Sequence, residues 1–174
     1  HSPLPWKWLA LFGLIHGFDK WLDMASFSFE TSVPLRLVRL VFLIASFLCL
    51  LEFGREGRKT FGREPLGAGI YAVLLGITAG GSYWGFNGLE ILSRYSLGFV
   101  GALWSAWVLW KASNHESTIY RPLRYAALAM AAFGVAVGAV VKQGVFFPAN
   151  SLHEGAFLEL FHLPVQLVRA VLAV

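Results

Sequence analysis

The chain has 174 residues, of which 57% are hydrophobic and only 14% charged, and its mean hydropathy is +0.62. This mix argues against an ordinary soluble domain, because so many uncharged segments in so short a chain would leave almost no polar surface. The net charge of +4 does not indicate a nucleic-acid partner, since the basic residues cluster between apolar segments. The composition therefore predicts an integral membrane protein.

Six apolar stretches predict six transmembrane helices, each near the roughly 20 residues that cross a ~30 Å hydrocarbon core. They cover residues 5–27, 34–55, 66–83, 87–112, 119–142 and 151–174. The four middle helices have apolar centres with at most one ionisable residue, whereas the first and last carry His, Asp, Glu and Arg. We expect an all-α bundle that forms a single transmembrane domain over residues 1–174.

The distribution of basic residues predicts the topology. The connection 54–63 is strongly basic and the connection 111–124 adds three more basic side chains, whereas 82–87 and 144–150 contain no Lys or Arg. Positively charged connections stay in the cytoplasm. Strict alternation then places both termini in the cytoplasm, with the multi-pass chain in the cytoplasmic membrane.

Small residues predict where the helices pack, because helices in lipid associate through close backbone approach. The fifth predicted helix repeats Ala127, Ala131, Gly134 and Gly138 at spacings of three and four, and the fourth has Gly98 and Gly101. We interpret both sets as packing seams.

Ionisable residues form stripes on three of the predicted helices. At 100° per residue, they align as His16, Asp19, Lys20 and Asp23 on the first helix, as Asn87, Glu90 and Arg94 on the fourth, and as Glu159, His162, Gln166 and Arg169 on the sixth. Such groups are costly in lipid and normally face the bundle interior. We therefore expect a polar cavity in the outer leaflet, with the two histidines near its floor.

The histidines leave three interpretations open. His16 and His162 lie half-way along facing helices and could be the axial ligands of a b-type haem, for which Gly13 and Gly17 would leave room. Each could instead hydrogen-bond a neighbouring carboxylate or carbonyl. A transition metal could also bind, with Asp19 and Glu159 as further donors.

Other polar residues suggest ligand binding without catalysis. Glu90 and Arg94 are one turn apart, which predicts an internal salt bridge or, if the arginine is uncommitted, a counter-ion for an anionic ligand or quinone oxygen. With these we expect His16, Asp19, Asp23 and Gln166 to contact the ligand or cofactor. No nucleophile, zinc-protease or nucleotide motif is visible, so we expect no enzyme activity in this segment.

At these residues the chain resembles the N-terminal multi-helix membrane input region of bacterial sensor histidine kinases and some diguanylate cyclases. The resemblance lies in Leu11–Asp23, Leu51–Arg55, Leu89–Glu90, Ser93–Tyr95, Leu97–Phe99, Phe146–Ala149, Pro164–Gln166 and Arg169. It covers a His-Gly step followed by an acidic residue and Trp, an Arg-Tyr pair and a Pro-Val-Gln motif. The chain is more polar than this pattern over residues 152–162, so the resemblance favours His16 over His162.

The resemblance implies a sensory input domain of a two-component system in the bacterial inner membrane. Its ligand or cofactor would bind in the cavity, and its last helix would lead into a cytoplasmic signalling module beyond Val174. The expected partners are the lipid bilayer, the small molecule, that module in cis and a second copy in a homodimer. The alternative is a cytochrome b-type or quinone-reactive electron-transfer protein, and a small transporter or channel is a third, weaker hypothesis.

Overall fold

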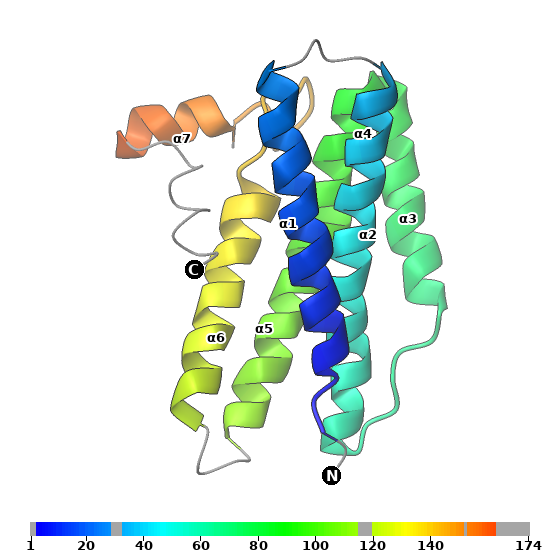
Figure 1. Cartoon of the computed structure of the whole chain (residues 1–174), viewed down its shortest axis with the longest axis vertical. Helices are drawn as coiled ribbons and strands as arrows, with labels where there is room; N and C mark the ends of the chain where they lie inside the picture. The colour runs from blue at the N-terminus through cyan, green and yellow to red at the C-terminus, as the bar shows by residue number, and fades with distance from the viewer. Residues whose placement is uncertain (1–2, 29–32, 115–119, 152, 163–174) are drawn as a thin grey trace.

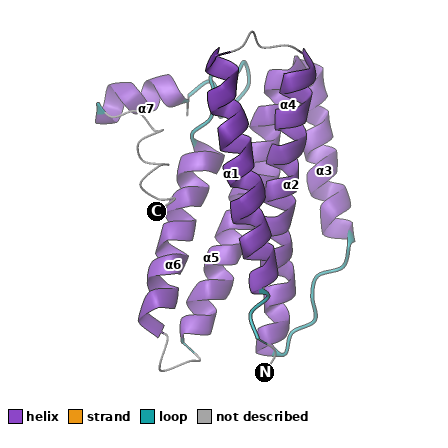
Figure 2. Ribbon diagram, viewed as in Figure 1, coloured by secondary structure: helices purple, strands orange, loops and turns teal. Residues whose placement is uncertain are grey.

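The fold is a bundle of helices with one short helix set apart from it. The computed structural model describes residues 3–28, 33–114, 120–151 and 153–162, and helix makes up 83% of it. Figure 2 shows only helices and connecting loops in the described part of the chain. Figure 1 shows the main helices running along one common direction, while α7 (Glu154–Phe161) projects sideways near one end.

The first two helices form a long pair, α1 (Trp6–Ser28) and α2 (Val33–Gly57), which run antiparallel. A 3₁₀ turn, η1 (Arg58–Phe61), continues α2 and ends at Gly62, whose positive φ of 67° suits glycine. This pairing places the end of α1 beside the beginning of α2. The beginning of α1 and the end of α2 lie together at the opposite end of the bundle.

The remaining helices are shorter and are joined by tighter turns. They are α3 (Gly69–Gly80), the 3₁₀ turn η2 (Gly81–Trp84), α4 (Gly85–Ser93), the π-helical η3 (Arg94–Phe99), α5 (Val100–Ser113), α6 (Tyr120–Phe133) and the π-helical η4 (Gly134–Ala139). The elements α4, η3 and α5 follow one another without a break, so a single helical path with a local widening runs through the bundle.

The prediction of six transmembrane helices is wrong. Within the described residues only Val33–Phe61 forms a helix long and apolar enough to cross a membrane, and one such helix is weak evidence for a membrane protein. The helix α1 is long enough but carries four charged residues, α3 has only 12 residues, and α7 has only 8. The strict alternation that placed both termini in the cytoplasm loses its basis with the six spans.

The centre of the bundle is closely packed around α2 and α5. Phe47, Leu50 and Leu51 of α2 are completely buried, as is Leu97 of η3. A Cβ atom added to Gly98 would lie 2.9 Å from the Phe47 ring. Gly98 therefore lets η3 approach α2 closely.

The second seam joins η4 to η3 and to the first turn of α5. A Cβ atom on Gly134 would lie 2.9 Å from Ala102, and one on Gly138 would lie 2.6 Å from the Cβ and 2.8 Å from the Cα of Phe99. The prediction that these glycines are packing seams is confirmed.

Candidate functional site

A polar cavity of about 240 Å³ opens at the end of the bundle where α1 ends and α2 begins. Its wall comes from four parts of the chain, namely the end of α1, the first turns of α2, the path through α4 and η3, and the connection after η4. The lining side chains are Asp19, Asp23, Arg36, Arg39, Leu40, Leu43, Phe86, Asn87, Glu90, Arg94 and Lys142.

Helical spacing explains why the charged side chains of each helix reach the cavity from one face. Asp19 and Asp23 are four residues apart and therefore share one face of α1, and Arg36 and Arg39 are three apart on α2. The antiparallel pairing of the two helices then sets the carboxylates opposite the guanidinium groups. Leu43, one turn further along α2, is buried in the core below.

The α1 side of the cavity is an ion-pair cluster. Asp19 is almost completely buried, with 2% of its surface exposed, and its Oδ2 lies 2.9 Å from Nζ of Lys20. The same ammonium group donates to Asp23 Oδ2 at 2.6 Å, and Arg39 Nη2 donates to the other oxygen of Asp23. Two basic groups thus hold Asp23 between α1 and α2, which makes both carboxylates tolerable away from water.

The opposite wall is built around Glu90. Arg94 Nη2 donates to Glu90 Oε1 at 3.0 Å, and Lys142 Nζ donates to Glu90 Oε2 at 3.1 Å. The predicted salt bridge between Glu90 and Arg94 is confirmed. Arg94 is buried, with 8% of its surface exposed, so its guanidinium group is held in place by the helix and by the carboxylate.

The cavity carries more positive than negative charge. Its lining includes the basic side chains Arg36, Arg39, Arg94 and Lys142 and the carboxylates Asp19, Asp23 and Glu90. Arg36 forms no ion pair with any residue that the structure describes. The Nε of Arg39 is buried and has no hydrogen-bond partner there. The wall therefore retains donors that an anion could satisfy.

His16 lies on the same helix but outside the cavity lining. Its ring stacks on Phe12 with centroids 5.2 Å apart and lies 5.8 Å from Phe47 and 5.6 Å from Phe133. Its Nδ1 is 3.2 Å from Ser46 Oγ, whose proton is donated to the Leu43 carbonyl at 2.8 Å. Nδ1 of His16 is therefore the donor to Ser46.

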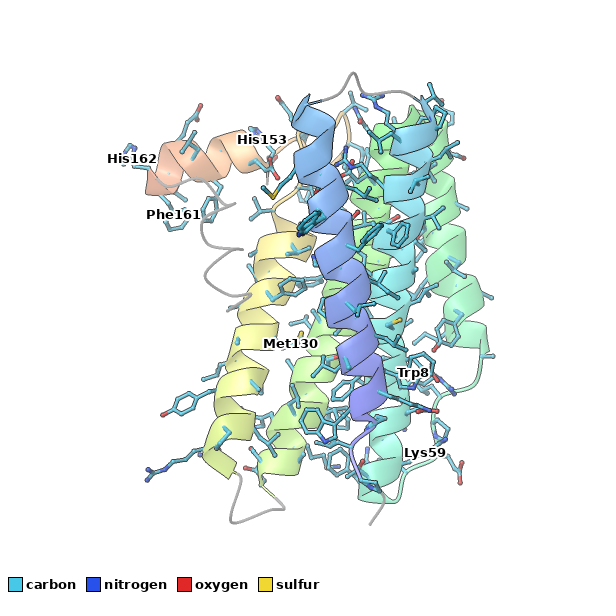
Figure 3. The ribbon with its side chains drawn as sticks, in the orientation of Figure 1. Trp8, Lys59, Met130, His153, Phe161 and His162 are labelled. Atoms are coloured by element: carbon cyan, nitrogen blue, oxygen red, sulfur yellow. The ribbon has the colours of Figure 1, made fainter. Side chains whose placement is uncertain are left out.

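His162 lies in a different part of the molecule. It follows α7 as its exposed C-terminal cap, with a positive φ of 53°, and Figure 3 shows it at the end of α7 that points away from the bundle. Glu159 is also exposed on α7. The predicted sixth helix over residues 151–174 is described only as far as His162, and Gln166 and Arg169 lie outside the described residues.

These positions bear on the haem and metal hypotheses. The structure does not place His16 and His162 on facing helices, and aromatic rings occupy the surroundings of the His16 imidazole. In the described ranges no group of three or more His, Cys, Asp and Glu side chains is arranged to hold a metal ion. The geometry favours the hydrogen-bonding interpretation of His16.

Three basic residues of the site were not predicted from the sequence. Arg36 and Arg39 lie at the start of α2, three residues apart and therefore on one face. Pairing that face with the polar end of α1 would have predicted both arginines as part of the site. Lys142 follows η4, and only the packed fold brings it to Glu90. The stripe of Asn87, Glu90 and Arg94 does face Asp19 and Asp23 across one cavity, while a binding role for these residues stays a prediction.

Comparison of the chain with known protein families, with curated protein sequences and with solved structures finds no match. The resemblance to membrane input regions of signalling proteins thus stays a prediction, and the function has to be argued from the site itself.

Proposed function

We propose that the chain is a membrane-embedded sensory input domain of a bacterial signalling protein, which binds a small anion in the end cavity and passes the binding event to α7. The observation that carries the proposal is the excess of basic groups around one cavity, with Arg36 and the Nε of Arg39 unpaired among the described residues. Catalysis has no part in it.

Exposed apolar side chains support a place in the membrane. They occur along most of the main helices, including Leu11, Leu14, Phe18 and Trp21 on α1, Leu37, Val38 and Val41 on α2, Val73, Leu75 and Ile77 on α3, and Tyr125, Leu128 and Val135 on α6 and η4. Soluble monomers rarely expose continuous apolar surfaces beyond a few hundred Å², and larger ones mark contact with a membrane or partner. The proposal rests on this side-chain surface and not on six separate spans.

The size and chemistry of the cavity limit the ligand. Pockets for drug-sized molecules have volumes of roughly 300–1,000 Å³, so about 240 Å³ suits a smaller one. Arginine forks match the paired oxygen atoms of carboxylate and phosphate. A short dicarboxylate or a phosphate-sized anion is therefore the ligand class we propose.

Lys142 offers a route from the cavity to α7. Its neighbour Val141 is completely buried and forms an isolated parallel β-bridge with His153. The carbonyl of Val141 also accepts from the backbone N–H of Glu154 at 3.0 Å, and Glu154 is the first residue of α7. An anion that draws Lys142 away from Glu90 would thus pull on the segment that anchors α7.

The electron-transfer alternative has no comparable support. It required His16 and His162 to share a cofactor, but His16 is half-buried against Phe12 on α1 and His162 lies at the far end of α7.

A binding titration tests the proposal. We expect detergent-purified full chain to bind succinate or inorganic phosphate saturably by isothermal titration calorimetry, with choline chloride giving no heat of binding. Arg36→Gln removes an exposed cation that forms no ion pair among the described residues, so the fold should persist. Loss of one charge-assisted contact of about 1.4 kcal/mol predicts roughly tenfold weaker binding.

The matched control is Arg121→Gln, which removes an exposed arginine from the other end of the bundle, on α6. Its affinity should equal that of the unmodified protein. The proposal is wrong if neither anion binds, or if Arg36→Gln and Arg121→Gln weaken binding equally.

A further inference from the structure

A second recess lies at the opposite end of the bundle from the anion cavity. It is an open groove of about 350 Å³ between the segment that follows α2, the beginning of α3 and the outer face of α5. Figure 3 shows Lys59, the neighbour of Arg58 in η1, at this end, together with Trp8 of α1. We call it the lower groove.

Two arginines line the groove at its η1 side. The Nε of Arg58 is buried and has no hydrogen-bond partner among the described residues, and Arg63 is exposed. Neither guanidinium group forms an ion pair within the described part of the chain. The nearby Arg55, by contrast, is already engaged, because its Nε donates to Glu52 at 2.7 Å. The charge of Arg58 and Arg63 is therefore left for a ligand.

A third cation reinforces this charge. Lys111 Nζ lies 4.6 Å from the centre of the Phe61 ring and 5.2 Å from the Trp107 ring, where cation–π attraction holds it. The Phe61 and Trp107 rings also contact each other edge to face, 6.0 Å apart. Aromatic and basic side chains are thus combined at this end, as they are at the interface between lipid and water.

The rest of the groove is apolar. Leu66 lies in the connection before α3 and Ile70 in the first turn of α3, Val100 and Trp104 come from α5, and Trp107 of α5 is exposed. The groove thus pairs a cationic end with an apolar wall. This combination matches a molecule that has an anionic head and a hydrocarbon tail, and it does not match a free inorganic anion, which would gain nothing from the apolar wall.

We propose that the lower groove binds one anionic diacyl phospholipid, with its phosphate on Arg58 and Arg63 and an acyl chain along Ile70 and Trp104. The inference rests on the proposed place of the chain in a bilayer, but it does not depend on the anion in the end cavity. Basic pockets beside membrane helices favour anionic head groups over zwitterionic ones, because the negative charge of an anionic lipid is not cancelled within its own head group.

Native mass spectrometry tests the inference. The full chain is incubated in detergent with equal amounts of phosphatidylglycerol and phosphatidylcholine, and the retained lipids are counted. We expect one phosphatidylglycerol per chain in excess of phosphatidylcholine. The double variant Arg58→Gln/Arg63→Gln should lose this lipid, while Arg121→Gln, which removes a cation at the same end but outside the groove, should keep it.

A second measurement needs no substitution. Phospholipids brominated on their acyl chains quench tryptophan fluorescence on contact, so brominated phosphatidylglycerol should quench the unmodified protein more strongly than brominated phosphatidylcholine at equal concentration. Soluble glycerol phosphate should not reverse this difference.

Equal retention of the two lipids, or retention unchanged in the double variant, would overturn the lipid site and leave the anion cavity unaffected. Displacement of the lipid by glycerol phosphate would instead reassign the arginines to a free phosphate. Failure to retain lipid of either class would contradict the place in the bilayer on which both proposals draw.

Discussion

At the scale of single residues, His16 and Asp19 share one side of α1 but are stabilised in different ways. Asp19 is buried beside the ammonium group of Lys20, whereas His16 lies among three phenylalanine rings and donates one hydrogen bond to Ser46. Aromatic stacking of this kind contributes about 0.5–1.5 kcal/mol per pair beyond the buried area. The imidazole is thus a packing group in this fold.

This packing role predicts opposite outcomes for two substitutions at one position. His16→Phe keeps a ring between Phe12 and Phe47 and should lower the free energy of unfolding by less than about 1.5 kcal/mol, the usual cost of a well-fitting swap. His16→Ala removes the ring and should cost about 2–4 kcal/mol. Unfolding of the detergent-purified protein followed by circular dichroism gives both values.

An equal loss in the two variants would show that the imidazole nitrogens, and not the ring, make the important contacts. A visible absorption band in the unmodified protein that both substitutions abolish would restore the haem hypothesis.

Sequence spacing alone predicts one of the two ion pairs of Glu90 and not the other. Glu90 and Arg94 are four residues apart, so their salt bridge followed from helical geometry. The contact between Glu90 and Lys142 joins residues 52 positions apart. No local pattern encodes such a contact, because it depends on how η4 and the chain after it pack against η3.

At the scale of elements, the apolar runs located the long helices well. The helix expected over residues 5–27 is α1, Trp6–Ser28, and the helix expected over 34–55 is α2, Val33–Gly57. The sequence did not predict the π-helical segments η3 and η4, because their hydrogen-bond register depends on packing against the partner segment and not on residue type. Of the sixth predicted helix, the described residues form α7, which ends at Phe161 and is capped by His162, and residues 163–174 lie outside the described part of the chain.

The contact between η3 and η4 can be tested by adding one methyl group. Gly138→Ala would place a Cβ atom within 3.0 Å of the Phe99 backbone nitrogen and closer still to its Cα and Cβ. The backbone atoms of Phe99 cannot move away without strain, so overpacking should reduce the free energy of unfolding by about 1–3 kcal/mol.

The matched control is Gly76→Ala in α3, where an added Cβ atom meets nothing within 4 Å. Because alanine favours helix over glycine, this variant should gain about 0.5–1 kcal/mol. If thermal unfolding gave the two variants equal stability, the seam would not be a close contact in solution.

At the scale of the whole molecule, composition proved a better guide to the surface than to the number of spans. The apolar residues that predicted six transmembrane helices form helices in much of the described chain, but among the described residues only Val33–Phe61 is long and apolar enough to be a candidate span. The apolar side chains on the outside of the bundle and the charged cavity at one end remain. Together they support a domain that contacts lipid at its sides and a small ligand at its end.

The central claim is that a ligand in the cavity moves α7. Spin labels at Tyr83→Cys in η2 and Leu160→Cys in α7, two exposed positions, report the distance between the bundle and that helix in a Cys49→Ala background. Double electron–electron resonance in nanodiscs should show a shifted distance distribution with whichever of succinate and phosphate binds, and no shift in Lys142→Gln. Identical distributions with and without saturating anion would contradict the account.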